Sequence, residues 1–99
     1  MQVEVRNNSD EQRFEAWVDG ALVGFAEYRR RPEAVVFIHT EVDPEYQGHG
    51  VAAQLAAGAL DQVRSAGGKI IAQCPYIAAY LRKHPEQQDL VLAGGGAGG

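Results

Sequence analysis

The hydrophobic pattern of this 99-residue chain changes from strand-like to helical close to Asp43, and no other feature constrains its fold as strongly. Before Asp43, short segments alternate apolar and polar side chains or gather aromatic and β-branched ones, as β-strands do. After it, apolar residues recur at helical spacing over residues 51–65. Strands followed by helices bury their apolar residues by packing the helices on a sheet. We therefore expect an α+β fold.

The first half predicts four strands joined by short turns. The strands are expected at residues 3–5, 14–18, 21–28 and 34–42, with turns at 7–10, 19–20 and 30–33. Asp19-Gly20 is typical of a type I′ hairpin, because both central residues of that turn need positive φ. Residues 35–38 are all apolar, so Val35 and Phe37 fall on one face and their neighbours on the other. A strand that is apolar on both faces is central. The four strands form an antiparallel meander.

The second half predicts a helix, a strand and a shorter helix. We expect a loop at residues 43–50, a helix at 51–65, a strand at 69–74, a helix at 77–84 and an extended piece at 89–92. One face of the first helix carries the apolar stripe Ala52, Ala56, Ala59 and Val63, with Val51, Leu55 and Leu60 beside it. Gly67 and Gly68 end this helix, and Pro75 ends the strand that follows. The expected fold is a mixed α/β sandwich, in which the antiparallel meander is followed by a helix, a parallel fifth strand and a short C-terminal helix.

Composition and charge bound the organisation and the partners. We expect one compact domain at residues 1–92 and a flexible tail at 93–99, which consists of five glycines and two alanines. Nine Lys and Arg against thirteen Asp and Glu give a net charge of −4, which argues against nucleic-acid binding. No apolar run is long enough to span a membrane, and the first residues do not resemble a secretory leader.

Cysteine usage indicates the compartment. Cys74 is the single cysteine, so neither an internal disulfide nor a cysteine-based metal cluster can form. We expect a cytoplasmic protein without a metal. The sequence does not indicate the oligomeric state, and a monomer is assumed.

Gln47-Gly48-His49-Gly50-Val51-Ala52 is the segment that points to chemistry. Glycines directly before a helix let several backbone N–H groups point the same way, and the helix adds its unpaired N–H groups and the positive end of its dipole. These groups together favour an anion, and a pyrophosphate fits them well. Neither a P-loop nor a dinucleotide-binding glycine pattern is present. The other interpretation is a glycine-rich helix start without a ligand.

The segment Gln47-x-x-Gly50-x-Ala52 resembles the Gln/Arg-x-x-Gly-x-Gly/Ala signature of the GNAT superfamily of acyl-CoA N-acetyltransferases. Further segments are similar to the short, single-domain yjdj-type branch of that superfamily. These segments are His39-Thr40-Glu41-Val42, Cys74-Pro75-Tyr76, Tyr80 and His84-Pro85. The resemblance covers about residues 3–92. It departs from larger members between the first two strands, where residues 6–13 are too few for the usual helical pair.

This resemblance implies that acetyl-CoA is the co-substrate and that an amine is the acceptor. The backbone of Gln47, Gly48, His49, Gly50, Val51 and Ala52 would hold the CoA pyrophosphate. The pantetheine arm would lie between the splayed ends of the fourth and fifth strands and pair with the backbone near Glu41 and Val42, as an added strand does. Cys74, Tyr76 and Tyr80 would also line this cofactor site.

Glu41 and His39 are the candidates for a general base. An ammonium cannot attack a thioester until it loses a proton, which a carboxylate or a neutral histidine can accept. The two residues are two positions apart on a strand and so project from one face. The resemblance favours Glu41, because many GNAT enzymes use a carboxylate of the fourth strand. The alternative is that both are polar residues at a strand end, paired with each other or with solvent.

Cys74 and Tyr80 are the other catalytic candidates. Cys74 is a covalent nucleophile, a proton donor to the departing thiolate, or a packing residue in the wall of the acetyl pocket. Covalent use needs the thiolate and a nearby base such as His39. Tyr76 and Tyr80 lie on one face of the short helix. The resemblance assigns proton donation to Tyr80, whereas packing of both rings onto the sheet is the alternative.

The sequence favours an acetyl-CoA-dependent N-acetyltransferase that moves an acetyl group directly to an amine, either a protein lysine or a small amine. A second hypothesis is a CoA- or acyl-CoA-binding module that does not catalyse transfer. A third is an interaction domain without a small ligand, whose open sheet face binds another protein.

Overall fold

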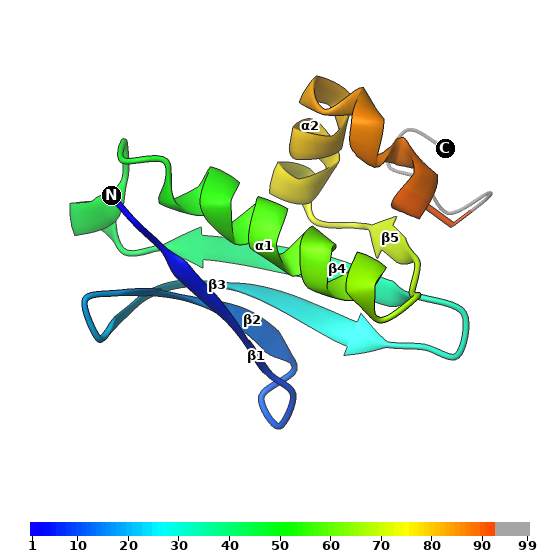
Figure 1. Ribbon diagram of the computed structural model, residues 1–99, viewed down its shortest axis with the longest axis horizontal. Helices are drawn as coiled ribbons and strands as arrows, with labels where there is room; N and C mark the ends of the chain where they lie inside the picture. The colour runs from blue at the N-terminus through cyan, green and yellow to red at the C-terminus, as the bar shows by residue number, and fades with distance from the viewer. Residues whose placement is uncertain (93–99) are drawn as a thin grey trace.

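The computed structural model of the protein describes residues 1–92, so the expected tail at 93–99 lies outside the described residues. Figure 1 shows a sheet and two helices packed against it, which is the expected α+β class. The elements are β1 (Glu4–Asn8), β2 (Arg13–Val18), β3 (Ala21–Arg30), β4 (Val35–Val42), η1 (Pro44–Tyr46), α1 (Val51–Ser65), β5 (Ile70–Ala72), α2 (Pro75–Lys83) and η2 (Pro85–Leu90). Among the described helices, none is both long and apolar enough to cross a membrane.

The sheet has the predicted topology. Its strand order is β1-β2-β3-β4-β5, with antiparallel pairing up to β4 and parallel pairing between β4 and β5. Asp19 and Gly20 connect β2 to β3 with φ of 49° and 80°, as a type I′ hairpin requires. The crossover from β4 through α1 to β5 places the loop before α1 at the end of the central strands.

The end of β1 differs from the sequence prediction. Asn7 and Asn8, expected in a turn, belong to β1 because they pair with Phe14 and Arg13 of β2. The turn instead contains Gln12, whose φ is 52°. Local turn preference is overridden here by cross-strand pairing.

The segment after α1 also differs from the prediction. β5 ends at Ala72 rather than at residue 74, because the amides of Gln73 and Cys74 both donate to the carbonyl of Phe37, at 2.9 and 2.8 Å. The extended piece expected at 89–92 is wrong for its first two residues, which lie in η2. Val91 then forms an isolated parallel bridge with Ile70, so only the end of that piece is extended.

Helix α1 has the predicted bounds, and its core face contains leucines beside the alanines. Ala52 of the expected stripe is half-buried. The buried residues are Val51, Leu55, Ala56, Ala59, Leu60 and Val63. At the C-terminal end of the helix, Gly67 has φ of 76°. Its amide donates to the carbonyl of Arg64 at 3.0 Å, and the Gly68 amide donates to the carbonyl of Val63 at 2.9 Å. This is a Schellman ending, as the glycine pair predicts.

A β-bulge in β4 changes the expected arrangement of its side chains. Glu27 of β3 pairs with His39, whereas the next residue, Tyr28, pairs with Phe37, so Ile38 is an extra residue on β4. Regular alternation would put Phe37 and His39 on the same face. Phe37 is instead fully buried against Tyr28, and His39 is exposed. The bulge therefore turns the second half of β4 over.

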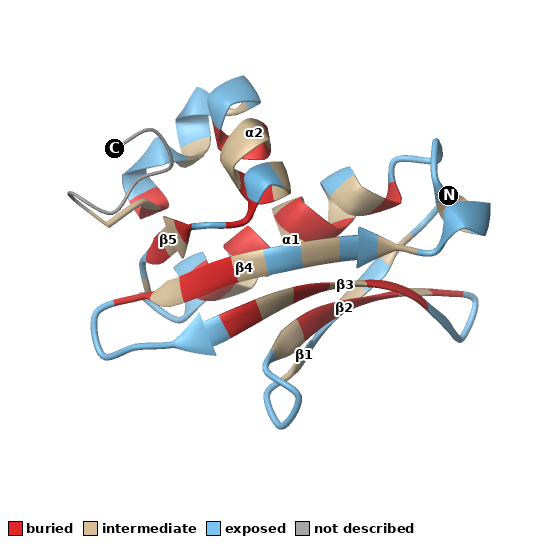
Figure 2. Ribbon diagram, turned by 180° about the vertical axis from the view of Figure 1, so that it is seen from behind, coloured by how far each residue is buried: buried red, intermediate tan, exposed pale blue. Residues whose placement is uncertain are grey.

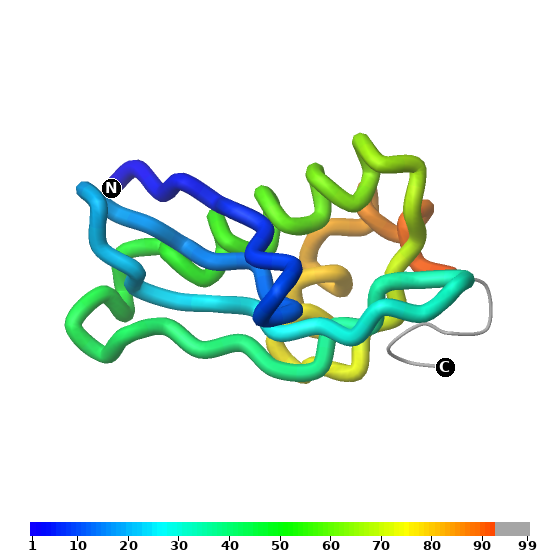
Figure 3. Tube along the Cα trace, turned by 90° about the horizontal axis from the view of Figure 1, so that it is seen from below, coloured from blue at the N-terminus to red at the C-terminus, as the bar shows by residue number. Residues whose placement is uncertain are grey.

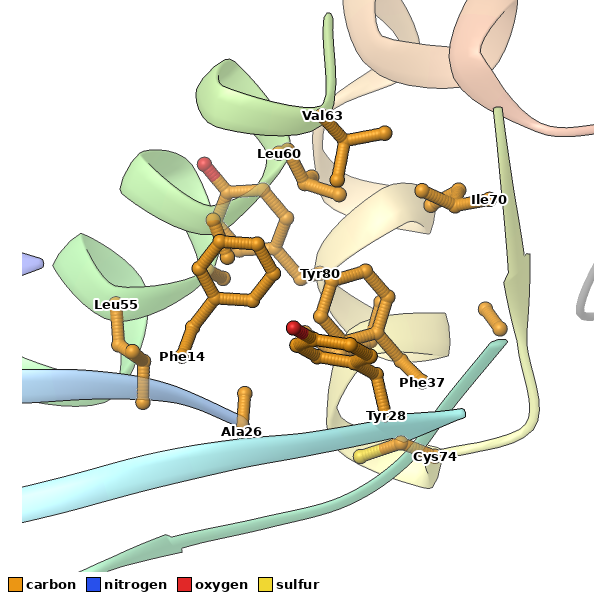
Figure 4. Close-up of a cluster of buried hydrophobic side chains, with 14 of the residues drawn as sticks. Phe14, Ala26, Tyr28, Phe37, Leu55, Leu60, Val63, Ile70, Cys74 and Tyr80 are labelled. Carbon is orange, nitrogen blue, oxygen red and sulfur yellow. The ribbon is translucent and has the colours of Figure 1, made fainter. Parts of the chain in front are cut away.

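The core lies between the sheet and the helices. Figure 4 shows aromatic rings of Phe14, Tyr28 and Phe37 gathered with side chains of α1 and α2. Figure 2 shows buried residues in α1, β2, β3 and the first half of β4. Strands β1–β4 lie side by side in Figure 3, and α1 packs on one face of them. Within residues 1–92 no helix covers their other face, which we call the open face.

Candidate functional site

The loop before α1 has the backbone geometry that the glycines predict. Gly48 and Gly50 have φ of 83° and 76°, a region that side chains other than glycine rarely adopt. Gly50 is the N-cap residue of α1, and its carbonyl accepts the amide of Gln54 at 3.1 Å. A Cβ at either glycine would meet nothing within 4 Å, so the space beside both backbones is open. Gly48 and Gly50 therefore leave open space beside the backbone of residues 48–50 at the start of α1, which we call the cradle.

Several amides around this cradle have no protein acceptor. Within residues 1–92, the amides of Gly48, His49 and Gly50 donate to no backbone or side-chain group. The first amides of α1, from Val51 onward, are also outside the helical bonding pattern. A cavity of about 190 Å³ lies here, lined by Val42, Tyr46, Gln47, Gly48, Gly50, Val51, Ala52, Ala53 and Tyr76. A phosphate group fits such a set of N–H donors at the positive end of a helix dipole.

The free edge of β4 begins beside this cavity. Pairing between β4 and β5 runs from Val35 with Ile70 to Phe37 with Ala72 and then stops. Beyond the bulge, residues 38–42 have no partner in β5. Unpaired backbone at a strand edge can bond an extended ligand as a further strand would. The cavity before α1 and this edge meet at Val42.

Cys74 lies at the point where the two strands separate. It is almost fully buried, and its Sγ is 3.2 Å from Oγ1 of Thr40. His39, the base considered for a covalent role, is not its partner, because the His39 ring is bonded to Glu41 instead. The surroundings of Cys74 are those of a packed thiol at the junction of β4 and β5.

The two tyrosines of α2 differ in their surroundings. Tyr76 lines the cavity before α1, whereas Tyr80 belongs to the core and stacks on His84, with ring centroids 4.0 Å apart. Within residues 1–92 the Tyr80 hydroxyl has no hydrogen-bond partner. Every fully buried side-chain N or O atom of these residues has one, so the Tyr80 hydroxyl is in contact with solvent. Burial is the main cause that raises the pKa of each phenol. The charges of Tyr80 and Cys74 add a smaller increase to the pKa of Tyr76, and the charge of Glu86 adds one to the pKa of Tyr80. Both hydroxyls therefore carry a proton at neutral pH.

Glu41 and His39 project from the open face, away from Cys74. Their side chains form a pair, with His39 Nε2 2.9 Å from Glu41 Oε1, and both are more than half exposed, at 51% and 62%. The pairing is one of the arrangements expected from sequence. The structure thus divides the catalytic candidates between the two faces of β4, with the free edge of β4 between them.

The described residues do not contain a metal-binding cluster. No group of three or more His, Cys, Asp and Glu side chains within residues 1–92 is arranged to hold a metal ion.

The family follows from a comparison with known domains. A family model described as GCN5-related N-acetyl-transferase matches residues 13–90 of the 99 in the chain. The chain belongs to the GCN5-related N-acetyltransferase family. The glycine loop, the free β4 edge and Cys74 all lie inside the matched region. Membership of this family supports acyl transfer as the chemistry of the domain. Among curated proteins, none matches the sequence significantly.

Solved structures agree with the family. A GCN5-like N-acetyltransferase from Staphylococcus aureus is 26% identical with a TM-score of 0.68, over 90% of this chain and 87% of that one. Ribosomal-protein-alanine N-acetyltransferase from Brucella melitensis biovar Abortus 2308 is 28% identical with a TM-score of 0.56, over 64% and 49%. The chain therefore spans about half the length of the Brucella enzyme. A GNAT-family acetyltransferase from Desulfovibrio desulfuricans, 23% identical with a TM-score of 0.54 over 75% and 52%, shares the fold.

Sequence reasoning missed the bulge at Ile38 and the contact of Thr40 with Cys74. A signal for the bulge was present. The polar residues His39 and Glu41 fall, by strict alternation, on the same face as the buried Phe37. That conflict between polarity and alternation is removed by one extra residue in the strand.

Proposed function

We propose that this domain transfers an acetyl group from acetyl-CoA directly to an amine. The observation that carries the proposal is the cradle at Gly48–Gly50, where unbonded amides, open space and a helix start coincide. The pyrophosphate would bind the amides from Gly48 to Ala52, with Gln47 and the first turn of α1 beside it. The free edge of β4 near Glu41 and Val42 would hold the pantetheine arm, and Tyr76 would close the cavity.

Two protons have to move during the transfer. On the open face, Glu41 would accept a proton from the ammonium, and His39, bonded to it at 2.9 Å, would orient the carboxylate. On the helix side, the Tyr80 hydroxyl would donate a proton to the departing thiolate, since its raised pKa keeps it protonated. Cys74 would form the wall of the acetyl pocket. Bound acetyl-CoA supplies the activated acyl group, and the chain positions both reactants.

Binding of acetyl-CoA tests the first half of the proposal. Asn tolerates positive φ, so Gly50→Asn keeps the backbone of the loop while its side chain enters the open cradle. We expect isothermal titration to show acetyl-CoA affinity lower by roughly tenfold or more in this variant. Gly20→Asn is the matched control, because Gly20 also has positive φ and open space but lies in a hairpin. Equal affinities of Gly50→Asn and Gly20→Asn would refute the assignment of the loop.

A non-catalytic CoA-binding module is the other function to be distinguished. Release of free CoA thiol with a panel of amines separates the two, since a binding module would titrate with acetyl-CoA and yet release no thiol.

A further inference from the structure

The open face contains a second cavity, next to the cavity before α1. It has a volume of about 270 Å³ and lies between the start of β3 and the end of β4. We call it the β3–β4 cavity. Its apolar lining includes Leu22, Phe25 and Pro44, and its charged lining consists of Arg13, Glu41 and Asp43. Val42 lines both this cavity and the cradle before α1, so the end of β4 separates the two.

The charges of the cavity are not balanced. The guanidinium of Arg13 is held by the buried Glu15 at 2.8 Å and lies 5.0 Å from the centre of the Phe25 ring. Within residues 1–92, neither Glu41 nor Asp43 has an arginine or lysine partner; Glu41 bonds only His39. Asp43 uses one oxygen to cap the amide of Glu45 at 2.9 Å. Two carboxylates are therefore left to attract a cationic ligand.

The walls of the cavity favour a flexible apolar chain between the charges. Leu22 is 40% exposed, which is high for a large apolar side chain among the described residues, and it stands beside Phe25 and Pro44. Methylene groups lying against these side chains would remove apolar surface from water. With a volume of about 270 Å³ the cavity is smaller than most drug-sized sites, so it accommodates a small acceptor.

We propose that the acceptor is an unbranched aliphatic diamine or polyamine that binds in the β3–β4 cavity. The inference rests on the proposed function. Glu41 binds the reacting ammonium beside the β4 edge, the methylene chain lies against Phe25 and Leu22, and Asp43 binds a second ammonium. A protein lysine would bring one cation into the cavity and leave Asp43 facing neutral backbone, so two carboxylates match a diamine better.

The transfer balances with the groups that the proposal names. The acceptor nitrogen forms a bond to the acetyl carbon as the carbon–sulfur bond of the thioester breaks. One ammonium proton passes through Glu41 to solvent, and a second proton ends on the CoA thiol by way of Tyr80. The products are an N-acetyl diamine that keeps one free cation, and CoA.

A comparison of acceptors tests this assignment. Thiol release would be measured with acetyl-CoA and 1,4-diaminobutane, spermidine, butylamine or a lysine-containing peptide. We expect kcat/KM for the two polyvalent amines to exceed that for butylamine by roughly tenfold or more, because butylamine lacks the second cation. Equal values for butylamine and 1,4-diaminobutane, or a preference for the peptide, would overturn the proposal.

Variants locate the second cation. Asp43→Asn keeps the cap on Glu45, since Asn is an equally good capping residue, but removes the charge. We expect it to lower kcat/KM for 1,4-diaminobutane by roughly tenfold and to lower the value for butylamine by much less. Asp19→Asn, in the hairpin with positive φ, is the matched control and should change none of these. An equal loss for both amines in Asp43→Asn would contradict the assignment.

The two proposals fail in different ways. Acetyl-CoA that does not bind would defeat the proposed function. Turnover of butylamine or peptide without a diamine preference would defeat the acceptor assignment alone. If no amine is turned over while acetyl-CoA binds, titration of 1,4-diaminobutane into the CoA complex decides. If 1,4-diaminobutane binds and Asp43→Asn lowers its affinity, the result supports the acceptor assignment. If 1,4-diaminobutane does not bind, the acceptor assignment is overturned.

Discussion

Glu15 is the buried charged residue among those that the structure describes, with 5% of its surface exposed. Its carboxylate accepts hydrogen bonds from Asn8 at 3.0 Å, Arg13 at 2.8 Å and the Trp17 indole at 3.2 Å. Burial is the largest single influence on the pKa of Glu15 and raises it, but the three hydrogen bonds and the charge of Arg13 together outweigh burial. The pKa of Glu15 is therefore below its ordinary value.

We predict that Glu15→Gln destabilises the fold by about 1–3 kcal/mol at pH 7, because the partners of a buried carboxylate lose charge-assisted bonds. Since the folded-state pKa is lowered, the stabilisation by Glu15 is complete above about pH 4.3, its unfolded value, and is lost as pH falls through the folded value. Urea unfolding of both proteins at pH 7 and pH 3 measures this. The difference between them should shrink at low pH.

Glu4→Gln serves as the control for this prediction. Glu4 is bonded to Arg6 on the same face but is 62% exposed. Its loss should leave the unfolding midpoint at pH 7 unchanged. The same midpoint for wild type and Glu15→Gln would show that the buried network does not stabilise the sheet.

Substitution of Cys74 and of Tyr80 distinguishes direct transfer, with Tyr80 as the proton donor, from a covalent route through Cys74. Because Cys74 is packed against Thr40, we predict that Cys74→Ala keeps turnover and that mass spectrometry after acetyl-CoA treatment finds no acetyl-Cys74. Tyr80→Phe should lower kcat by roughly tenfold or more without changing acetyl-CoA affinity, as expected for loss of a general acid. Accumulation of acetyl-Cys74 in the wild type would instead establish a covalent route.

Helix α1 and strand β1 pack closely where Gly58 faces Val5. A Cβ at Gly58, in the middle of α1, would lie 2.6 Å from Cγ2 and 2.8 Å from Cβ of Val5. Neither atom is the end of a flexible chain, so the helix or the strand would have to move. Glycine in a helix is less favourable than alanine, and here close packing on β1 is the physical reason for it.

We predict that Gly58→Ala destabilises the protein by about 1–3 kcal/mol, despite the better helix propensity of alanine, because it overpacks the contact with Val5. In a Val5→Gly background, which removes the Cβ of residue 5 as well as both Cγ atoms, the same change should instead stabilise by up to about 1 kcal/mol, as helix propensity alone dictates. Denaturant unfolding of the four proteins forms the double-mutant cycle. Stabilisation of the unmodified background by Gly58→Ala would show that the strand yields.

Across the molecule, residues 1–92 contain the sheet, both helices and the proposed site, and the last described contacts join Val91 and Leu92 to Ile70. We predict that deleting residues 93–99 leaves the unfolding midpoint, acetyl-CoA affinity and turnover unchanged, because glycine and alanine bury little apolar surface. Thermal unfolding and titration of the shortened chain measure this. A lower midpoint would show that the tail contributes to the fold.

Local patterns in the sequence were sufficient for much of the fold. The bounds of α1, the Asp19-Gly20 turn and the Schellman ending at Gly67 follow from interactions within a few residues, so they can be predicted without knowledge of the partner strands. The glycine loop before α1 was predicted for the same reason, because positive φ at Gly48 and Gly50 is a local property.

Contacts between distant segments determined the rest. Pairing with β3 placed the extra residue Ile38 in β4, and that bulge put Phe37 in the core while turning His39 and Glu41 to the open face. The β3–β4 cavity exists only because the start of β3 and the end of β4 lie side by side. The register of a strand and the position of a bulge depend on the neighbouring strand. The alternation of apolar residues within one strand does not show which strand it will pair with.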